Sequence, residues 1–284
     1  EPFTDESSSF YNISRNLYKS IYGNSLVFEE VNHDLNLCFR YGWYNSEKFG
    51  FVKKSSLIHL GEEDVKIRLL DGIKNILPYG VDYGFQNEYS NLLDAYKKNE
   101  LIEGTTLGLF MLSSIPVDRA EPSEALKTTA VWSVGCGKTS NILISDKQIS
   151  KFKRGLDLET EFDVRASRGT YFVNAQLELG PHSQKDWFTI AEINLDSSQI
   201  SNLNQFINST ENIEEYIKND IQKGTNQLKK MVSYADGFQM TNTDLCCVRH
   251  YSNTMFNIMR GGVFTNNYSI DKEGNAYIMT KVYL

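Results

Sequence analysis

The sequence lacks the marks of several protein classes. Its four cysteines include no C-x-x-C spacing, and two of them, Cys246 and Cys247, are adjacent. Neighbouring cysteines rarely bond to each other, so we predict buried free thiols rather than a disulfide framework or a metal site. No apolar run approaches the ~18 residues of a membrane span. We therefore predict no membrane partner, and a cytoplasmic location, with secretion or a periplasmic location left open.

Clustered positive charge is also scarce. The formal net charge is −7, which argues against a nucleic-acid partner, because neutralising phosphates takes an excess of Lys and Arg. The basic runs are short, and we interpret pairs such as Lys53-Lys54 and Lys97-Lys98 as solvated faces. The nucleophile motif G-x-S-x-G and the zinc motif H-E-x-x-H are absent. We predict that this chain carries no catalytic residue and no cofactor.

One short stretch, AVWSVGCGKTS at Ala130–Ser140, invites a nucleotide-binding interpretation. A phosphate loop needs G-x-x-x-x-G-K-[ST] followed by a helix, whose N-terminus helps to bind the phosphates. Here Trp132 stands where the first glycine belongs, and the strand-like run Asn141–Ser145 follows. The sequence instead predicts a hairpin turn between Thr128–Val134 and Asn141–Ser145, in which Gly135 and Gly137 supply the permissive backbone.

What the chain does contain is a long series of predicted strands. With 284 residues, 40% of them hydrophobic, it can form one large domain or two modest ones. Short apolar or alternating runs separated by polar turns predict an antiparallel meander rather than βαβ units. The predicted strands are Leu26–Val31, Asp34–Tyr44, Phe49–Leu60, Val65–Leu77, Thr105–Ile115, Thr128–Val134, Asn141–Ser145, Tyr171–Leu179 and Trp187–Asn194.

Helices are predicted mainly at the C-terminal end. One amphipathic helix over Asn87–Glu100 interrupts the strands, and Asp146–Arg154 fits a short helix. After Leu195 the pattern changes to a long helix over Ser209–Tyr234 and another from Asp244 to about Arg260. The strands-then-helices order predicts either an α+β domain or a β-sandwich followed by linker helices.

Aromatic residues are the most distinctive feature, with 16 Tyr, 16 Phe and 3 Trp. Sugar rings stack on aromatic faces while polar neighbours bind their hydroxyls, so we predict carbohydrate contacts. A second candidate is the acidic loop Ser113–Lys127, where an arginine can clamp an oxygen ligand. The candidate carbohydrate-binding residues are Trp43, Tyr44, Tyr79, Tyr83, Asp118, Arg119 and Glu121.

Three runs carry a resemblance to a known family. They are Phe39–Leu60, Leu69–Asn87 (LLDGIKNILPYGVDYGFQN) and Ser113–Ser133 (SSIPVDRAEPSEALKTTAVWS). These runs resemble the N-terminal region of cellobiose-phosphorylase-like proteins of the glycoside hydrolase grouping. The resemblance implies a mainly β fold, a galactose-mutarotase-like antiparallel β-supersandwich over 1–195, with linker helices over 196–284. It also implies an (α/α)6 barrel that carries the catalytic aspartate, and we expect that barrel to lie outside this chain.

The resemblance implies a non-catalytic domain of a sugar phosphorylase or glycoside hydrolase. The implied partners are an oligosaccharide or disaccharide, with inorganic phosphate in the parent protein and a homodimer contact left open. One alternative is a self-sufficient mutarotase-like enzyme, which would pair His59 or His182 with Glu178 or Asp186. The other alternative is a stand-alone glycan-binding module.

Overall fold

The computed structural model describes residues 1–114, 126–239 and 241–262, with the backbone alone at 138–140. Its strands are β1 (Ile13–Lys19), β2 (Ser25–Asn32), β3 (Leu37–Ser46), β4 (Gly50–His59), β5 (Val65–Ile76), β6 (Lys97–Leu101), β7 (Gly108–Leu112), β8 (Thr128–Val134), β9 (Lys138–Leu143), β10 (Asp163–Arg165), β11 (Gly169–Leu179) and β12 (Gln184–Leu195). Its helices are α1 (Asp5–Phe10), α2 (Tyr83–Ala95), α3 (Ile149–Lys153), α4 (Ser197–Ser209), α5 (Ile213–Tyr234) and α6 (Asp244–Met259).

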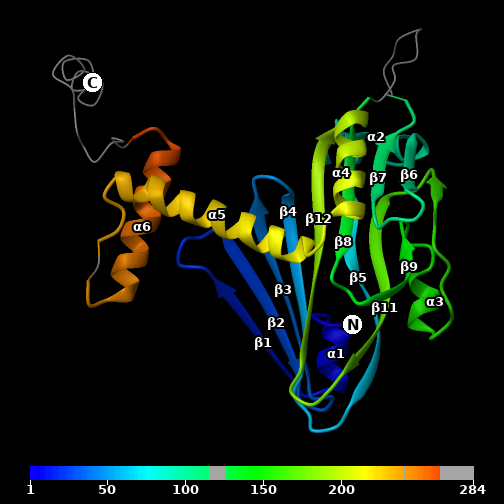
Figure 1. Cartoon of the computed structure of the whole chain (residues 1–284), viewed down its shortest axis with the longest axis horizontal. Coiled ribbons are helices and arrows are strands. Elements are labelled where there is room, and N and C mark those ends of the chain that lie inside the picture. The colour runs from blue at the N-terminus through cyan, green and yellow to red at the C-terminus, as the bar shows by residue number, and fades with distance from the viewer. Residues whose placement is uncertain (115–125, 240, 263–284) are drawn as a thin grey trace.

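The strands form two antiparallel sheets. The larger has nine strands in the order β1-β2-β3-β4-β12-β8-β7-β6-β10, and the smaller has three in the order β5-β11-β9. The first four strands are neighbours in chain order, as expected of a meander. The described part of the chain is therefore mainly β and has its last three helices after the strands, which confirms the predicted fold class (Figure 1).

Two hydrophobic cores lie on opposite faces of the nine-stranded sheet. The inner core fills the space between the two sheets, where Tyr171 of β11 and Trp187 of β12 are fully buried. The outer core lies under α4 and α5, where Ile213 and Ile217 of α5 pack with Trp132 and Phe188 of the sheet. Strand β8 lies between the two cores, and six of its seven residues are buried.

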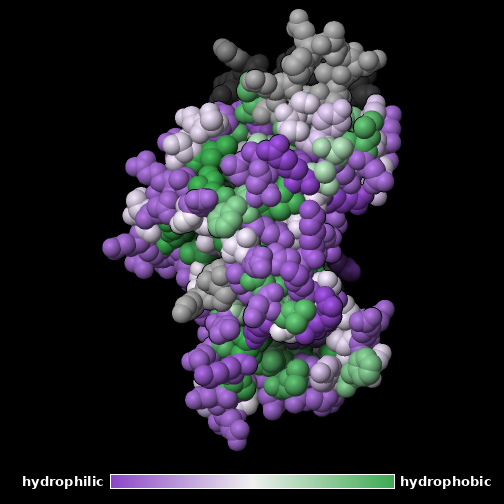
Figure 2. Space-filling view, turned by 90° about the vertical axis from the view of Figure 1, so that its right-hand side faces the viewer, coloured by the Kyte–Doolittle hydropathy of each residue, from purple (hydrophilic) through white to green (hydrophobic). Residues whose placement is uncertain are grey.

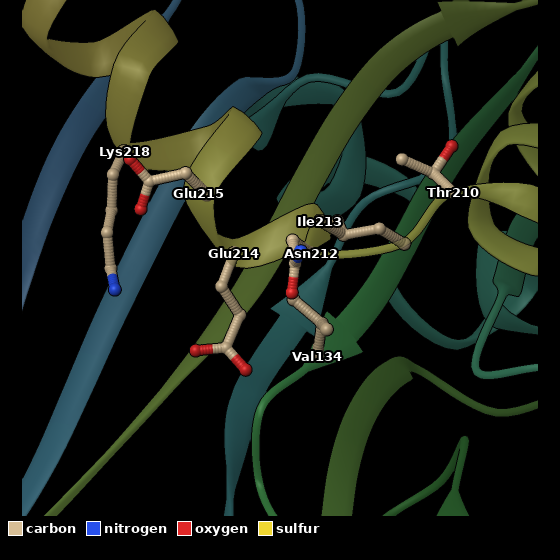
Figure 3. Close-up of a pocket in the computed structure, with 7 residues that line it drawn as sticks. All are labelled: Val134, Thr210, Asn212, Ile213, Glu214, Glu215 and Lys218. Carbon is tan, nitrogen blue, oxygen red and sulfur yellow. The ribbon is translucent and has the colours of Figure 1, made fainter.

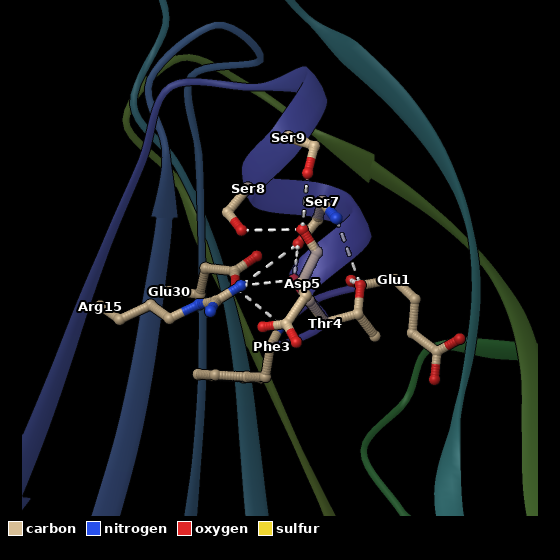
Figure 4. Close-up of polar contacts among 9 residues, drawn as sticks. All are labelled: Glu1, Phe3, Thr4, Asp5, Ser7, Ser8, Ser9, Arg15 and Glu30. Atoms are coloured by element: carbon tan, nitrogen blue, oxygen red, sulfur yellow. Dashed lines mark hydrogen bonds and ion pairs between the residues drawn. The ribbon is translucent and has the colours of Figure 1, made fainter.

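The N-terminal segment lies between the sheets at the side of β1 to β3 (Figure 1). Phe3 packs against the inner-face rings of Phe39 and Tyr41, with ring centroids 6.2 and 5.3 Å away. Arg15 of β1 ties this segment to the sheet, because it donates to the Thr4 carbonyl at 2.6 Å and to Glu30 at 2.8 Å (Figure 4). The N-terminal residues therefore complete the inner core where the sandwich is open.

Two predicted helices differ from the structure. The helix predicted at Asn87–Glu100 is α2, which ends at Ala95, and the chain continues into β6. Ser90 inside α2 has φ of 44°, which breaks the regular 3.6-residue period, so the predicted apolar stripe is not buried as one face. The long helix predicted over Ser209–Tyr234 is α5, which begins only at Ile213 because Thr210 is extended and Asn212 is left-handed; α4 precedes it and was not predicted.

The predicted hairpin between Thr128–Val134 and Asn141–Ser145 is also wrong. Strand β8 belongs to the nine-stranded sheet, whereas β9 pairs with β11 in the smaller sheet. Gly135 and Gly137 do have positive φ values, 87° and 79°. That backbone freedom carries the chain from one sheet to the other instead of turning it back on itself.

The cysteines are all free, but only two are buried. Cys38 and Cys136 lie in the interior, and burial raises the pKa of the Cys136 thiol to about 12. Cys246 is exposed on α6, contrary to the prediction, because α6 projects beyond the sheets (Figure 1) and buries only Tyr251 and Thr254. The face seen from α3 and β9 is largely hydrophilic, with apolar side chains in patches between the polar ones (Figure 2).

Candidate functional site

The structure describes four of the seven predicted site residues and brings two of them to one end of the sandwich. Tyr79 and Tyr83 are exposed, in the turn before α2 and in its first turn. Trp43 and Tyr44 lie in β3, away from α2 (Figure 1). Because they are neighbours in a strand, their side chains point to opposite faces of the sheet. Tyr44 packs against the outer core. The other three candidates, Asp118, Arg119 and Glu121, lie outside the described residues.

Tyr83 lines a small hollow that we call the α2 pocket. Its volume is about 160 Å³, and it is formed by the end of β5, the first turns of α2, the start of β6 and the residue before β11. The lining residues are Asn75, Ile76, Leu77, Tyr83, Gln86, Asn87, Lys97 and Arg168. The pocket thus has a short apolar wall, formed by Ile76 and Leu77, with polar side chains around it.

Local sequence explains why these residues meet. Asn75 adopts a left-handed conformation with φ of 57°, and β5 ends at the next residue. A turn follows, in which the Val81 N–H donates to the Pro78 carbonyl at 3.1 Å. Asp82 then caps α2 by accepting from the Phe85 N–H at 2.7 Å. The first turn of α2 is thereby held against the end of β5.

Buried charge lies behind the pocket. The Lys97 side chain is 1% exposed and donates to Gln86 and, at 2.8 Å, to Asp94. Arg168 donates to the same carboxylate at 3.2 Å. Burial opposes the charge on Asp94, but hydrogen bonds from Lys97, Gln86 and Arg168 outweigh it and hold the pKa of this carboxyl below its ordinary value.

Sequence reasoning missed most of this pocket. The pair Lys97-Lys98 was predicted to be a solvated face, yet Lys97 is buried, and so is Lys53 of the pair Lys53-Lys54. Both pairs lie in strands, where adjacent side chains point to opposite faces, so one lysine of each turns inward. That alternation was the signal available in the sequence. Arg168, next to Gly169, carried no such signal.

A larger and more open hollow lies where α5 begins. It has a volume of about 600 Å³ and is lined by Val134, Thr210, Asn212, Ile213, Glu214, Glu215 and Lys218 (Figure 3). A neighbouring hollow of about 270 Å³ shares Val134 and Ile213 with it and includes Gly135 to Gly137. A Cβ on Gly135 would lie 3.0 Å from the Glu214 carboxylate. The acidic side chain of Glu214 therefore lies against Gly135, in the stretch that was considered as a phosphate loop. None of the predicted site residues lines either hollow.

The catalytic pairs of the mutarotase-like alternative each have other partners. His59 is buried and its Nδ1 lies 3.0 Å from the Gly180 carbonyl, while His182 pairs with Glu62 at 3.0 Å. Glu178 pairs with Lys66, and Asp186 pairs with Lys54. Within the described ranges, no three His, Cys, Asp or Glu side chains lie close enough to hold a metal ion, and no helix is long and apolar enough to cross a membrane.

Comparison with known proteins gives structural likeness only. The chain matches no family model and no curated protein. Among solved structures it is similar to a bacterial glucoamylase in complex with acarbose, with 9% identity, a TM-score of 0.47, and coverage of 86% of this chain and 32% of that one. It is also similar to a protein described as a kojibiose phosphorylase from the human microbiome, with 8% identity, a TM-score of 0.37, and coverage of 88% and 25%.

A third similar structure is a family GH92 α-mannosidase from Bacteroides thetaiotaomicron, with 8% identity, a TM-score of 0.37, and coverage of 89% of this chain and 29% of that one. The chain thus spans a third or less of the length of each of these structures. Because every TM-score is below 0.5, the likeness assigns neither an activity nor a substrate to this chain.

Proposed function

We propose that this chain is a non-catalytic, galactose-mutarotase-like domain of a larger carbohydrate-active protein, and that it contacts a saccharide at the α2 pocket. One observation carries the proposal. Six of the eight lining residues belong to Leu69–Asn87, one of the runs on which the family resemblance rests. Thr129, which belongs to the run Ser113–Ser133, donates to the Leu77 carbonyl at 2.9 Å and so contacts the same segment.

The chemistry of the pocket suits a sugar. Asn75 and Asn87 carry amides, which both donate and accept hydrogen bonds, as hydroxyl groups do. The Tyr83 ring is 76% exposed, and an exposed ring can stack against the C–H face of a sugar. Tyr79 is exposed in the adjoining turn. An aromatic face beside convergent amides is the arrangement that binds a polyhydroxylated ring.

We also propose that 1–195 is a β domain and that 196–284 leads to a helical domain, and the helices support this division. The end of α5 and all of α6 project beyond the sheets (Figure 1). Large apolar side chains are exposed there: Met231, Tyr234, Leu245, Phe256 and Met259. A surface of this kind fits a docking partner, and we assign it to a helical domain of the parent protein.

Ligand-detected NMR tests the saccharide contact. We expect saturation transfer to at least one class of gluco- or manno-oligosaccharide, measured with and without inorganic phosphate. Tyr83→Ala should weaken binding about tenfold, which corresponds to about 1.4 kcal/mol of lost stacking. Tyr11→Ala is the matched control, since Tyr11 is also an exposed ring, near α1. No transfer across the panel, or equal losses in both variants, would contradict the proposal.

A further inference from the structure

The α2 pocket has more positive than negative charge built into it. Its cations are the ammonium of Lys97 and the guanidinium of Arg168, and both pair with the single carboxylate of Asp94. The cluster therefore carries one uncompensated positive charge. Of the other charged groups on the adjoining elements, Lys74 and Glu88 are exposed and of opposite sign. The Asp82 carboxylate does not line the pocket and caps α2 by accepting from the Phe85 N–H.

Arg168 is the cation that a ligand can reach. Its side chain is 54% exposed, and it lines the pocket. Only its Nε has a hydrogen-bond partner in the part of the chain that the structure describes, which leaves both Nη groups as donors. Two parallel N–H groups of a guanidinium match the two oxygens of a carboxylate or of a sulfate or phosphate ester.

Lys97 adds a second, buried positive charge to the pocket. Its ammonium has three donors, and Gln86 and Asp94 take two of them. Because its side chain is 1% exposed, little water screens its charge. Asp94 holds both cations in place, so the positive side of the pocket is set before any ligand arrives. An arrangement of this kind favours an anionic ligand over a neutral one.

We propose that the α2 pocket is selective for acidic saccharides, and that Arg168 binds the oxyanion group while Tyr83 and the amides bind the ring. This inference rests on the proposed saccharide contact and adds the charge of the ligand to it. The neutral gluco- and manno-oligosaccharides would then be the weaker ligands. Affinity for an acidic sugar should fall as salt is added, because Arg168 is half exposed and its charge is screened.

The test compares two sugars that differ in one group, methyl β-D-glucuronide and methyl β-D-glucoside. We expect the glucuronide to bind at least tenfold more tightly to the full chain in NMR titrations. Arg168→Gln should lower the glucuronide affinity at least tenfold more than the glucoside affinity and thereby remove that difference. The matched control is Arg165→Gln, which removes an equal charge from an arginine that pairs with Asp163 outside the pocket and should keep the difference.

The outcomes separate this inference from the proposed function. Equal binding of the two sugars would overturn the selectivity but leave the saccharide contact standing. Absence of binding by both sugars, together with silence across the oligosaccharide panel, would overturn both. Inorganic phosphate is the third probe. If it displaces the glucuronide at equal concentration, the pocket recognises the oxyanion alone, which would overturn the assignment of a saccharide ligand.

Discussion

Glu29 shows at the scale of single residues how a buried charge is held in this fold. It lies in β2, and its carboxylate accepts from Asn16 at 2.8 Å, from Tyr18 at 3.0 Å and from Arg40. Burial opposes its ionisation, but these hydrogen bonds outweigh burial and hold the pKa of Glu29 below its ordinary value of 4.5. A lowered folded-state pKa means that ionised Glu29 stabilises the fold at neutral pH.

We therefore predict an acid-sensitive contribution from Glu29. It should be fully present above about pH 4.5, the ordinary pKa, and be lost as the pH falls through the lowered value. Glu29→Gln should reduce the free energy of unfolding at pH 7 by about 1–3 kcal/mol, because charge-assisted hydrogen bonds are lost. Urea unfolding at pH 7 and at pH 4 measures both effects. If the variant retained the pH dependence of the wild type, the prediction would be wrong.

A matched control for Glu29 is Glu178→Gln. Glu178 pairs with Lys66 across β11 and β5, and both side chains are largely exposed. Exposed ion pairs contribute little to stability, so this variant should unfold like the wild type at both pH values. A loss equal to that of Glu29→Gln would mean that overall charge, rather than the buried contacts, sets the acid sensitivity.

At the scale of elements, the pairing of β5 with β11 leaves no room for a side chain at Gly72. A Cβ there would lie 1.8 Å from the Tyr171 carbonyl oxygen and 2.8 Å from Phe172. Both neighbours are strand residues in the longest pairing of the smaller sheet. The two strands can approach this closely only because position 72 carries no side chain.

We predict opposite effects for alanine at two glycines. Gly72→Ala should lower the free energy of unfolding by at least about 2 kcal/mol, because the strands must separate locally. Gly224→Ala in α5 should raise it by about 0.5–1 kcal/mol, since nothing lies within 4 Å and alanine favours a helix. Thermal and urea unfolding measure both variants. A Gly72→Ala protein as stable as the wild type would show that β5 and β11 are not paired in this register.

At the scale of the whole molecule, the projecting helices decide how the chain behaves alone. Several apolar side chains at the end of α5 and on α6 are exposed in a single chain, and Met259 is 76% exposed. Exposed apolar area of this extent favours association. We predict that the isolated chain binds an apolar dye and self-associates, and that the paired change Phe256→Asp with Met259→Asp reduces both.

Sedimentation over a concentration series is the measurement for this prediction. The control is Leu17→Asp, an exposed leucine of similar accessibility in β1, which should leave association unchanged. If a specific dimer persisted in the paired variant, its contact surface would lie elsewhere than on Phe256 and Met259. That result would support the homodimer that the resemblance left open. A monomer with no dye binding would argue against a helical domain docked on these helices.

The sequence by itself determined the class of fold. Alternating or continuous apolar runs predicted most of the long strands to within a few residues, and β8 spans Thr128–Val134 as predicted. These patterns succeed because a strand must present one or both faces to a core, and that requirement is written locally in the residues. The same local logic excluded a phosphate loop at Ala130–Ser140.

Only the tertiary structure decided which strands pair, which lysines turn inward and which residues meet. The partner of β9 is β11 rather than β8, because two glycines redirect the chain between sheets. The α2 pocket combines Asn75, Tyr83, Lys97 and Arg168 from four separate segments. No spacing in the sequence brings Arg168 to this site, because it is distant along the chain and only the packing of β11 places it beside α2 and β6.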